Sequence, residues 1–397
     1  MKQNNTQELH VSIDVGCYQH DISVGLADGT FLGRFEINHD KVGFAEFFKQ
    51  VEQYKTQSNG TVSVAMEGYN GHARPLDRMI QSKSYRLLNI NNLKLARFKE
   101  IFPGAAKTDP IDSRKGLELF QLQQVLPLAK NVLQEVYAIP RVNQELKRLT
   151  RRRRRLVNER VSYINTLQTD LRALSPGLVE ISKDVKNIWF LNFLDSAKDL
   201  EALARKSKKT LLKINQVGLK YVEVILKWQK NATFSDDASF MFPMLKQDIT
   251  RIIELRSMIH ELDKHIKEKL ECSQIGQRLL TIKGFGVTSC AELAGEIACI
   301  ERFKKESSLA LYIGMAALDN SSGKHKGSKK SKQVNRHAKA AMMVAVDHQR
   351  RGNEQSQRYY DKKRLEGKKH NQAIRSLGRH LTRVIFNMLK DDRDYYV

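Results

Sequence analysis

Cysteine, proline and tryptophan are scarce in this 397-residue chain, which contains four, seven and two of them. The cysteines, at positions 17, 272, 290 and 299, form no CxxC pair, which argues against a zinc site or a disulfide framework. No apolar run approaches the length that spans a bilayer, and the polar start MKQNNTQELH is not typical of a signal peptide. These absences predict a protein of a reducing, cytoplasmic compartment without a membrane segment.

Acidic residues are too few to balance the basic ones. The chain has 68 Lys and Arg against 44 Asp and Glu, a net charge of +24 and a pI of about 9.8. Such a surface attracts polyanions, and nucleic acid is the commonest polyanion in a cell. The basic residues are spread over several segments, which disfavours a membrane-surface helix. We therefore predict a nucleic-acid partner and, from the length, two or three domains.

The first hundred residues alternate between predicted strands and helices. Short apolar runs predict strands at 9–13, 21–26, 31–37, 61–66 and 85–90, and helical spacing predicts helices at 41–54, 72–82 and 91–100. Residues 27–30 (ADGT) are typical of a hairpin turn between two of these strands. The order βββαβαβα fits the ribonuclease H-like fold, in which the first and fourth strands are neighbours.

Four carboxylates lie at the ends of predicted strands or at the start of a predicted helix. Asp14 and Glu67 follow the first and fourth predicted strands, so they should meet at one sheet edge. Asp109 and Asp112 lie three residues apart at a predicted helix start, where an N-cap, Pro110 and an acid at N3 offer a purely structural alternative. Four converging carboxylates require cations to stay ionised, and hard oxygen ligands favour Mg²⁺, with Mn²⁺ also suitable. We therefore predict a two-metal site for phosphodiester chemistry.

Residues 131–272 are predicted to form long helices. Apolar residues recur mostly at steps of three and four between Leu146 and Leu174, before a stop at Ser175-Pro176-Gly177, and more regularly between Ile252 and Leu270. These seams predict an antiparallel or intermolecular coiled coil, and with it a dimer. Five consecutive arginines, Arg151, Arg152, Arg153, Arg154 and Arg155, predict phosphate contacts, although a solvated charge run has the same appearance.

The region from 273 to the end predicts a third, mainly helical unit. Lys283, Gly284 and Gly286 form a G-x-G turn before a helix, which resembles the phosphate clip of a helix-hairpin-helix motif, although the same glycines can simply turn the chain. A serine- and lysine-rich loop follows, in which Ser322 is a candidate nucleophile and the alternative is a basic linker. Its candidate phosphate-binding residues are Lys324, Lys326, Lys329, Lys330, Lys332 and Arg336.

These motifs together resemble one family. I-D-V at 13–15, M-E-G-Y at 66–69, K-T-D-P-I-D at 107–112, I-K-G-F-G at 282–286 and S-S-G-K at 321–324 resemble the insertion-sequence one-ten transposases, including their eleven-eleven branch, which are related to pilin-gene invertases. Two positions depart from the usual family pattern. Cys17 stands where a lysine is common, and a lysine-rich run from Lys326 to Lys332 follows the serine.

The resemblance implies a site-specific DNA recombinase that cuts and rejoins strands to move an insertion sequence, guided by a bridge RNA and active as a tetramer of two dimers in a prokaryotic nucleoid. It implies a RuvC-like DEDD domain at 1–130, a helical coiled-coil domain at 131–272 and a serine-bearing transposase domain at 273–397. By the same resemblance, Asp14, Glu67, Asp109 and Asp112 bind Mg²⁺. Ser322, or less favourably Ser321, attacks the DNA, while Ser328 and Ser331 are weaker candidates.

Two other functions fit the same residues. A junction-resolving endonuclease would use only the four acids and water, and would leave free DNA ends without a protein adduct. A non-catalytic nucleic-acid scaffold would use the acids as helix caps alone, and magnesium would not matter to it. All three functions share salt-dependent binding to nucleic acid, so that property does not separate them.

Overall fold

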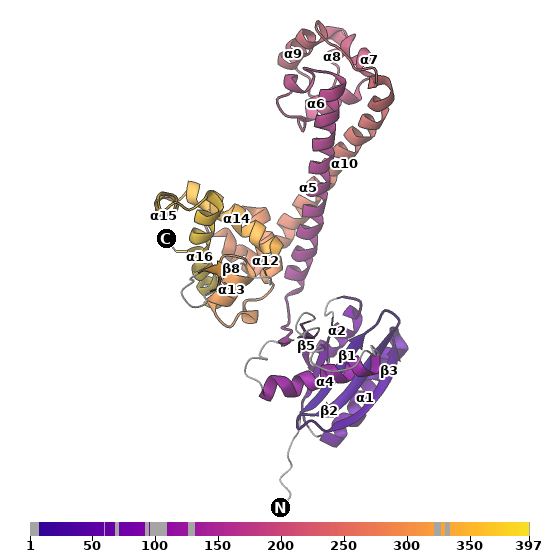
Figure 1. The fold of residues 1–397 in the computed structure, drawn as a ribbon, viewed down its shortest axis with the longest axis vertical. Coiled ribbons are helices and arrows are strands. Elements are labelled where there is room, and N and C mark those ends of the chain that lie inside the picture. Colours follow the sequence, from indigo (N-terminus) through magenta and orange to yellow (C-terminus); the bar gives the residue numbers. More distant parts are fainter. Residues whose placement is uncertain are drawn as a thin grey trace, which may run out of the picture. The chain divides into compact units, whose positions relative to one another are not determined.

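A computed structural model describes residues 8–58, 60–67, 71–91, 95, 109–125, 132–320, 327–329 and 334–396. The chain divides into two compact units, residues 1–138 and 139–397, and each is described by itself. The first unit is built on a sheet and the second is almost entirely helical (Figure 1). The mixed α/β and helical composition predicted from the sequence is therefore confirmed. In the described part of the chain, no helix is both long and apolar enough to cross a bilayer.

The first unit contains a six-stranded mixed sheet in the order β3-β2-β1-β4-β5-β6. The strands are β1 (Leu9–Val15), β2 (Gln19–Leu26), β3 (Phe31–Asn38), β4 (Val62–Met66), β5 (Arg86–Ile90) and β6 (Leu133–Glu135). β1 pairs antiparallel with β2 and parallel with β4, so the predicted adjacency of the first and fourth strands is confirmed. The three-residue β6 at the sheet edge escaped prediction because so short a run has no readable periodicity.

Helices cover both faces of this sheet. Alternate residues of the central strands, such as Val11 and Ile13, pack against α1 (Lys41–Ser58) and α2 (Arg74–Ser82) on one face. Helix α4 (Asp109–Val125) covers the other face, mainly over β1 and β2, and its Leu119 and Phe120 belong to one hydrophobic cluster with residues of β4 and β5. The predicted helix start near Asp109 is confirmed. The predicted helix at 91–100 lies almost entirely outside the described residues.

Two 34-residue helices dominate the second unit. α5 (Arg141–Leu174) and α10 (Ala238–Glu271) pack antiparallel within one chain, joined by the ion pairs Glu145–Lys269, Arg153–Asp263 and Glu159–Arg251. The predicted seam residues of α10, including Ile252, Leu255 and Ile259, are buried as expected. Between α5 and α10 the chain forms a helical cap with its own core, made of α6 (Ile188–Asp195), α7 (Leu200–Ala204), α8 (Lys208–Leu211) and α9 (Leu219–Gln229).

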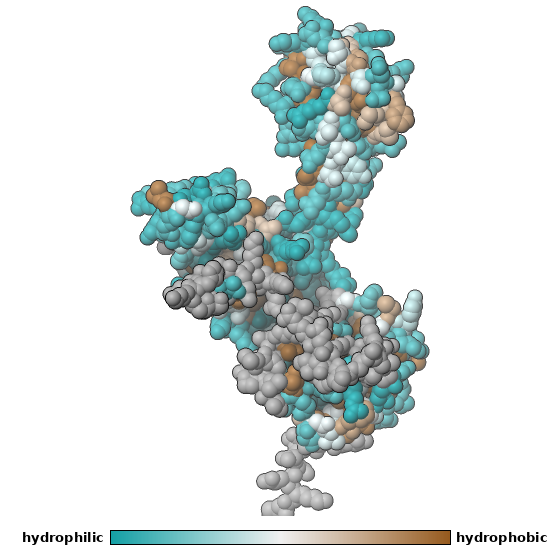
Figure 2. Space-filling view, viewed as in Figure 1, coloured by the Kyte–Doolittle hydropathy of each residue, from teal (hydrophilic) through white to brown (hydrophobic). Residues whose placement is uncertain are grey.

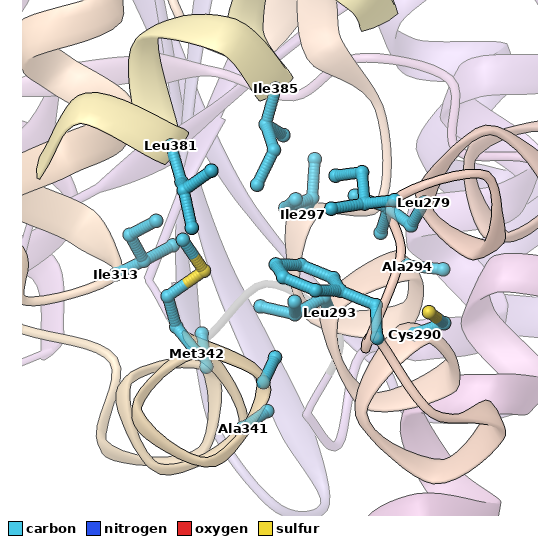
Figure 3. Packing of buried hydrophobic residues seen from close by; sticks show 14 of the residues in the cluster. Leu279, Cys290, Leu293, Ala294, Ile297, Ile313, Ala341, Met342, Leu381 and Ile385 are labelled. Atoms are coloured by element: carbon cyan, nitrogen blue, oxygen red, sulfur yellow. The ribbon is translucent and has the colours of Figure 1, made fainter. Parts of the chain in front are cut away.

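The remaining helices enclose another core at the opposite end of the α5–α10 pair. They are α11 (Gln274–Leu280), α12 (Val287–Ile297), α13 (Glu306–Tyr312), α14 (Arg336–Arg351), α15 (Glu354–Leu365) and α16 (His370–Lys390). Cys290, Leu293 and Ile297 of α12 meet Met342 of α14 and Leu381 of α16 in this core (Figure 3). Hydrophilic residues cover most of the visible surface of these helices and of the α5–α10 pair (Figure 2).

Candidate active site

Asp14 and Glu67 lie at the ends of two adjacent parallel strands. The register pairs Ile13 of β1 with Met66 of β4, so Asp14 and Glu67 are the next residues along two neighbouring strands. Both are half-buried. Side chains alternate along β1, and Asp14 belongs to the same face as His10 and Ser12, the face that α4 covers. The sheet therefore brings these two acids to one edge, as their positions in the sequence predict.

Contacts between α4 and β1 fix how the helix lies along this strand. The ring of Phe120 stacks on His10, with 4.0 Å between centroids. One turn earlier, Gly116 lies so close to Ser12 that any Cβ would collide with the serine hydroxyl. Two residues of a strand and four residues of a helix each rise about 6–7 Å. Each pair of β1 residues therefore lies beside one turn of α4. The first turn of α4, which contains Asp109 and Asp112, therefore lies at the level of Asp14.

A buried polar cluster fixes this first turn to the sheet. Ser113, the residue after Asp112, donates a hydrogen bond to the carboxylate of Asp21 and lies 2.8 Å from the hydroxyl of Ser23. Asp21 is 4% exposed and also accepts a 2.7 Å hydrogen bond from Nε of Arg34. In the β1–β2 register Asp21 faces Asp14 directly. The cluster therefore connects the helix that carries two of the acids to the strand pair that carries a third.

We expect Asp21→Ala to lower the free energy of unfolding of the first unit by about 3 kcal/mol, because it leaves the Arg34 and Ser113 donors without their buried acceptor. Urea unfolding of the full chain, followed by hydrogen exchange of the β1 and β2 amides, measures this loss. Glu36→Ala is the matched control, since Glu36 pairs with the same arginine from an exposed position. It should cost less than about 1 kcal/mol. Equal losses would contradict an anchoring role for Asp21.

A small hairpin flanks the serine-rich stretch in the sequence. β7 (Leu318–Asp319) pairs with β8 (Ser328–Lys329), and the amide of Asn320 donates a 2.9 Å hydrogen bond to the carbonyl of Gly327. Residues 321–326 connect the two ends. Several predicted site residues lie outside the described ones: Ser321, Ser322, Lys324, Lys326, Lys330, Ser331 and Lys332, together with the side chains of Asp109, Asp112, Ser328 and Lys329.

The predicted glycine turn joins two helices of the second unit. Gly284 has φ of +91° and its Cα lies against the backbone of Gln349, so both the conformation and the space require glycine. Gly286 is the N-cap of α12, and a Cβ there would meet no atom within 4 Å. The turn next to Lys283 is thus open at the helix N-terminus, as a phosphate clip requires. Arg336, the first residue of α14, is exposed.

The five arginines of α5 do not share one environment. Arg151 and Arg154 pair with the buried acids Glu296 and Glu292 of α12, and Arg153 pairs with Asp263 of α10. Arg152 and Arg155 are exposed, and no described carboxylate forms an ion pair with either. Three of the arginines therefore hold helices together, and the other two face solvent and are available to a polyanion.

Two family models match the chain on both sides of the central helices. The model "Transposase", for the DEDD domain of IS110 elements, matches residues 11–176, and "Transposase IS116/IS110/IS902 family" matches residues 276–361. Together they cover more than half of the chain. The chain belongs to the IS110 family of transposases.

Curated relatives agree with this assignment over most of the transposase. It is 25% identical to the insertion element IS110 43.6 kDa protein of Streptomyces coelicolor, over 76% of this chain and 75% of the relative. It is 23% identical to the insertion element IS116 44.8 kDa protein of Streptomyces clavuligerus, over 97% and 95% of the two chains. An insertion element IS900 protein of Mycobacterium paratuberculosis is 31% identical over 36% of this chain. The IS110-family transposase therefore acts in DNA recombination.

A DEDD transposase domain indicates a divalent metal, and the donor chemistry of this transposase is compatible with one. The acids at the carboxyl ends of β1 and β4 and at the start of α4 supply only carboxylate oxygens, which suit hard cations. Within the described ranges no three His, Cys, Asp or Glu side chains gather as ligands, and the side chains of Asp109 and Asp112 fall outside those ranges. The residues present thus fit the metal class that the domain indicates.

Sequence reasoning missed Asp21 and Ser113. Asp21 belongs to a predicted strand and was not distinguished there, because its position opposite Asp14 follows from the β1–β2 register, and the short connection at 16–18 was not recognised as a hairpin turn. Ser113 directly follows a candidate acid, and its role appears only when α4 is docked on the sheet. A missed acid on α12, Glu296, could not be found from periodicity, since its partners Arg151 and Asn335 are 145 and 39 residues away.

Proposed function

We propose that this IS110-family transposase cuts and rejoins DNA strands with a four-acid metal cluster and the nucleophile Ser322. The observation that supports the proposal best is the meeting of Asp14 and Glu67 at one sheet edge, with the first turn of α4 at the same level. In this interpretation the first unit is a RuvC-like, ribonuclease H-like domain covering 1–130. A helical domain, 131–272, and a serine-bearing domain, 273–397, follow it.

The chemistry divides between two sets of residues. Asp14, Glu67, Asp109 and Asp112 hold divalent cations, Mg²⁺ or Mn²⁺, which when bound stabilise negative charge on the scissile phosphate. Oγ of Ser322 attacks phosphorus and loses its proton, and the bond from phosphorus to the departing sugar oxygen breaks, so that this oxygen leaves with a proton. A sugar hydroxyl of the second strand then attacks the phosphoserine, forms the new phosphodiester and returns the serine. Bond energy is retained in the adduct, so rejoining needs no external energy source.

The proposed reaction makes a testable intermediate. A DNA substrate with a nick near the cleavage site should trap a covalent adduct in the presence of Mg²⁺, because the released fragment diffuses away. Peptide mass spectrometry should place the nucleotide on Ser322. Free DNA ends without an adduct would instead identify the junction-resolving endonuclease.

The resemblance extends the proposal to a bridge RNA and to a tetramer built from two dimers. A net charge of +24 is compatible with binding two nucleic acids at once. Sequencing the RNA that co-purifies with the transposase from its host tests the first part. A noncoding sequence next to the gene, with loops complementary to the element ends, should be recovered, whereas random cellular RNA would contradict guidance. Light scattering with and without RNA and DNA tests the assembly.

For the arginines of α5, we expect Arg152→Gln and Arg155→Gln each to lower the salt slope of DNA binding by about 0.9, the value for one phosphate contact. Neither should change thermal stability by more than a degree or two, since both side chains face solvent. Arg154→Gln is the matched control: it leaves the buried Glu292 without its partner, so it should destabilise the protein with little effect on the slope. Titrations by fluorescence anisotropy at several salt concentrations measure the slopes.

A further inference from the structure

Glu296 of α12 is a carboxylate buried at the centre of a hydrogen-bond network. It is 1% exposed, and Arg151 donates to its two oxygens from Nε and Nη2 at 2.6 and 2.9 Å. Asn335 donates from Nδ2 at 2.7 Å, and the ammonium of Lys147 lies at 3.7 Å. Burial raises the pKa of Glu296, but the bonds from Arg151 and Asn335 and the charge of Lys147 outweigh it, and the pKa falls below its ordinary value. The carboxylate is therefore ionised at neutral pH.

Two partners of Glu296 join distant points of the chain. The hydroxyl of Tyr312, the last residue of α13, donates to the backbone carbonyl of Glu296 at 3.0 Å and accepts from Nδ2 of Asn335 at 2.7 Å. The backbone N–H of Asn335 also donates to the backbone carbonyl of Tyr312 at 2.8 Å. Oδ1 of Asn335 caps α14 by accepting from the amides of His337 and Ala338. We call Glu296, Tyr312 and Asn335 the loop clamp.

The loop clamp closes the base of the serine-bearing segment. Residues 313–334 leave the clamp at Tyr312 and return to it at Asn335, and they contain the β7–β8 hairpin. Within the segment, the bond from Asn320 to Gly327 makes a second closure around 321–326. The chain that contains Ser322 in sequence is therefore closed by described residues at two points, at Asn320–Gly327 and at the loop clamp.

Apolar residues on the opposite face of α12 fill the hydrophobic core, so the core does not need Glu296. Cys290, Leu293 and Ile297 already pack there against α14 and α16 (Figure 3). On the other side, the backbone at Gly295 packs closely against the backbone of α5 at Lys147. Replacing a buried ion pair by apolar residues often costs no stability. A carboxylate at this position orients its partners, because its hydrogen bonds fix the side-chain amide of Asn335 and the guanidinium of Arg151 in one geometry.

We propose that Glu296 is a positioning residue that sets the placement of the Ser322 segment through Asn335 and Tyr312. The inference rests on the proposed function of Ser322. Nucleophilic displacement at phosphorus depends steeply on alignment, so loosening the clamp should slow formation of the phosphoserine adduct while leaving DNA binding intact.

The test uses three variants of the full chain. Asn335→Asp keeps the cap of α14 but turns an oxygen toward the Glu296 carboxylate, so the two charges repel. The double variant Glu296→Gln with Asn335→Asp restores an amide–carboxylate pair with reversed polarity and the original total charge. Tyr312→Phe removes one hydroxyl and keeps the ring. We expect Asn335→Asp and Tyr312→Phe to lower the single-turnover rate of adduct formation roughly 10- to 100-fold. The double variant should recover to within about threefold of the wild type.

Two further measurements separate positioning from general stability. Hydrogen exchange should accelerate at the amides of Asn320 and Lys329 in the slow variants and return to the original rate in the double variant, whether or not the protein is active. Glu292→Gln, which disturbs the neighbouring buried pair without touching Tyr312 or Asn335, should leave both readouts unchanged at temperatures where the protein is folded. Equal effects of Glu292→Gln and Asn335→Asp, or no rescue in the double variant, would overturn the proposal.

Ser322→Ala, run in the same assays, separates a failure of the proposed nucleophile from a failure of the loop clamp. An adduct that persists in Ser322→Ala contradicts the proposed nucleophile, while the exchange rates still report on the clamp. Loss of the adduct in Ser322→Ala, together with a normal rate in Asn335→Asp, supports the nucleophile and contradicts the clamp.

Discussion

Ser322→Ala is expected to abolish both the covalent protein–DNA adduct and strand transfer, with a loss of about three orders of magnitude or more in rate. The substitution removes one oxygen, and no other group in the proposed mechanism can form the phosphoester. DNA affinity should stay within about twofold, because phosphate contacts come from lysines and arginines. Denaturing gels of the nicked substrate measure the adduct, and filter binding measures the affinity.

Ser321→Ala is the matched control for this prediction, since it removes the same hydroxyl one residue earlier. We expect it to retain most of the adduct. A reversal, with Ser321→Ala inactive and Ser322→Ala active, would shift the nucleophile by one position and keep the mechanism. Full activity of both variants would exclude a serine nucleophile in this segment and favour water as the attacking group.

Asp14→Asn and Glu67→Gln are expected to reduce cleavage by about 10³-fold or more, which corresponds to about 4 kcal/mol of transition-state stabilisation. Each substitution keeps the size of the side chain and removes the charge that a divalent cation requires. Chelation with EDTA should have the same effect on the wild type, and Mg²⁺ or Mn²⁺ should reverse it. Initial rates of cleavage across a metal titration measure both losses.

Glu36→Gln provides the comparison for these acids, because it removes a negative charge from an exposed position of the same sheet. It should cleave at the wild-type rate with an unchanged metal requirement. If Asp14→Asn behaves in the same way, or if EDTA has no effect, the acids are structural and the proposed metal cluster is wrong.

The sequence predicted the sheet better than it predicted the interactions around the site. Local alternation was enough to find β1 to β5, and strand order alone placed Asp14 beside Glu67. The docking of α4 depends on Phe120 stacking on His10, 110 residues earlier, and no local pattern contains that contact. The arginine run shows the same limit, because charge alone cannot tell Arg151, which pairs with a buried acid, from Arg152, which faces solvent. In both examples the partner, buried His10 or buried Glu296, lies more than a hundred residues away, so a local pattern does not contain the contact.

The order of elements along the chain has a consequence during synthesis. β1, β2 and β3 form a meander of local pairs that can assemble early, whereas β4 must arrive before Glu67 meets Asp14. The α4 acids follow some forty residues later, and the serine segment lies beyond the long antiparallel helices. A nascent or prematurely ended chain that stops before Ser322 therefore carries an incomplete set of the proposed groups.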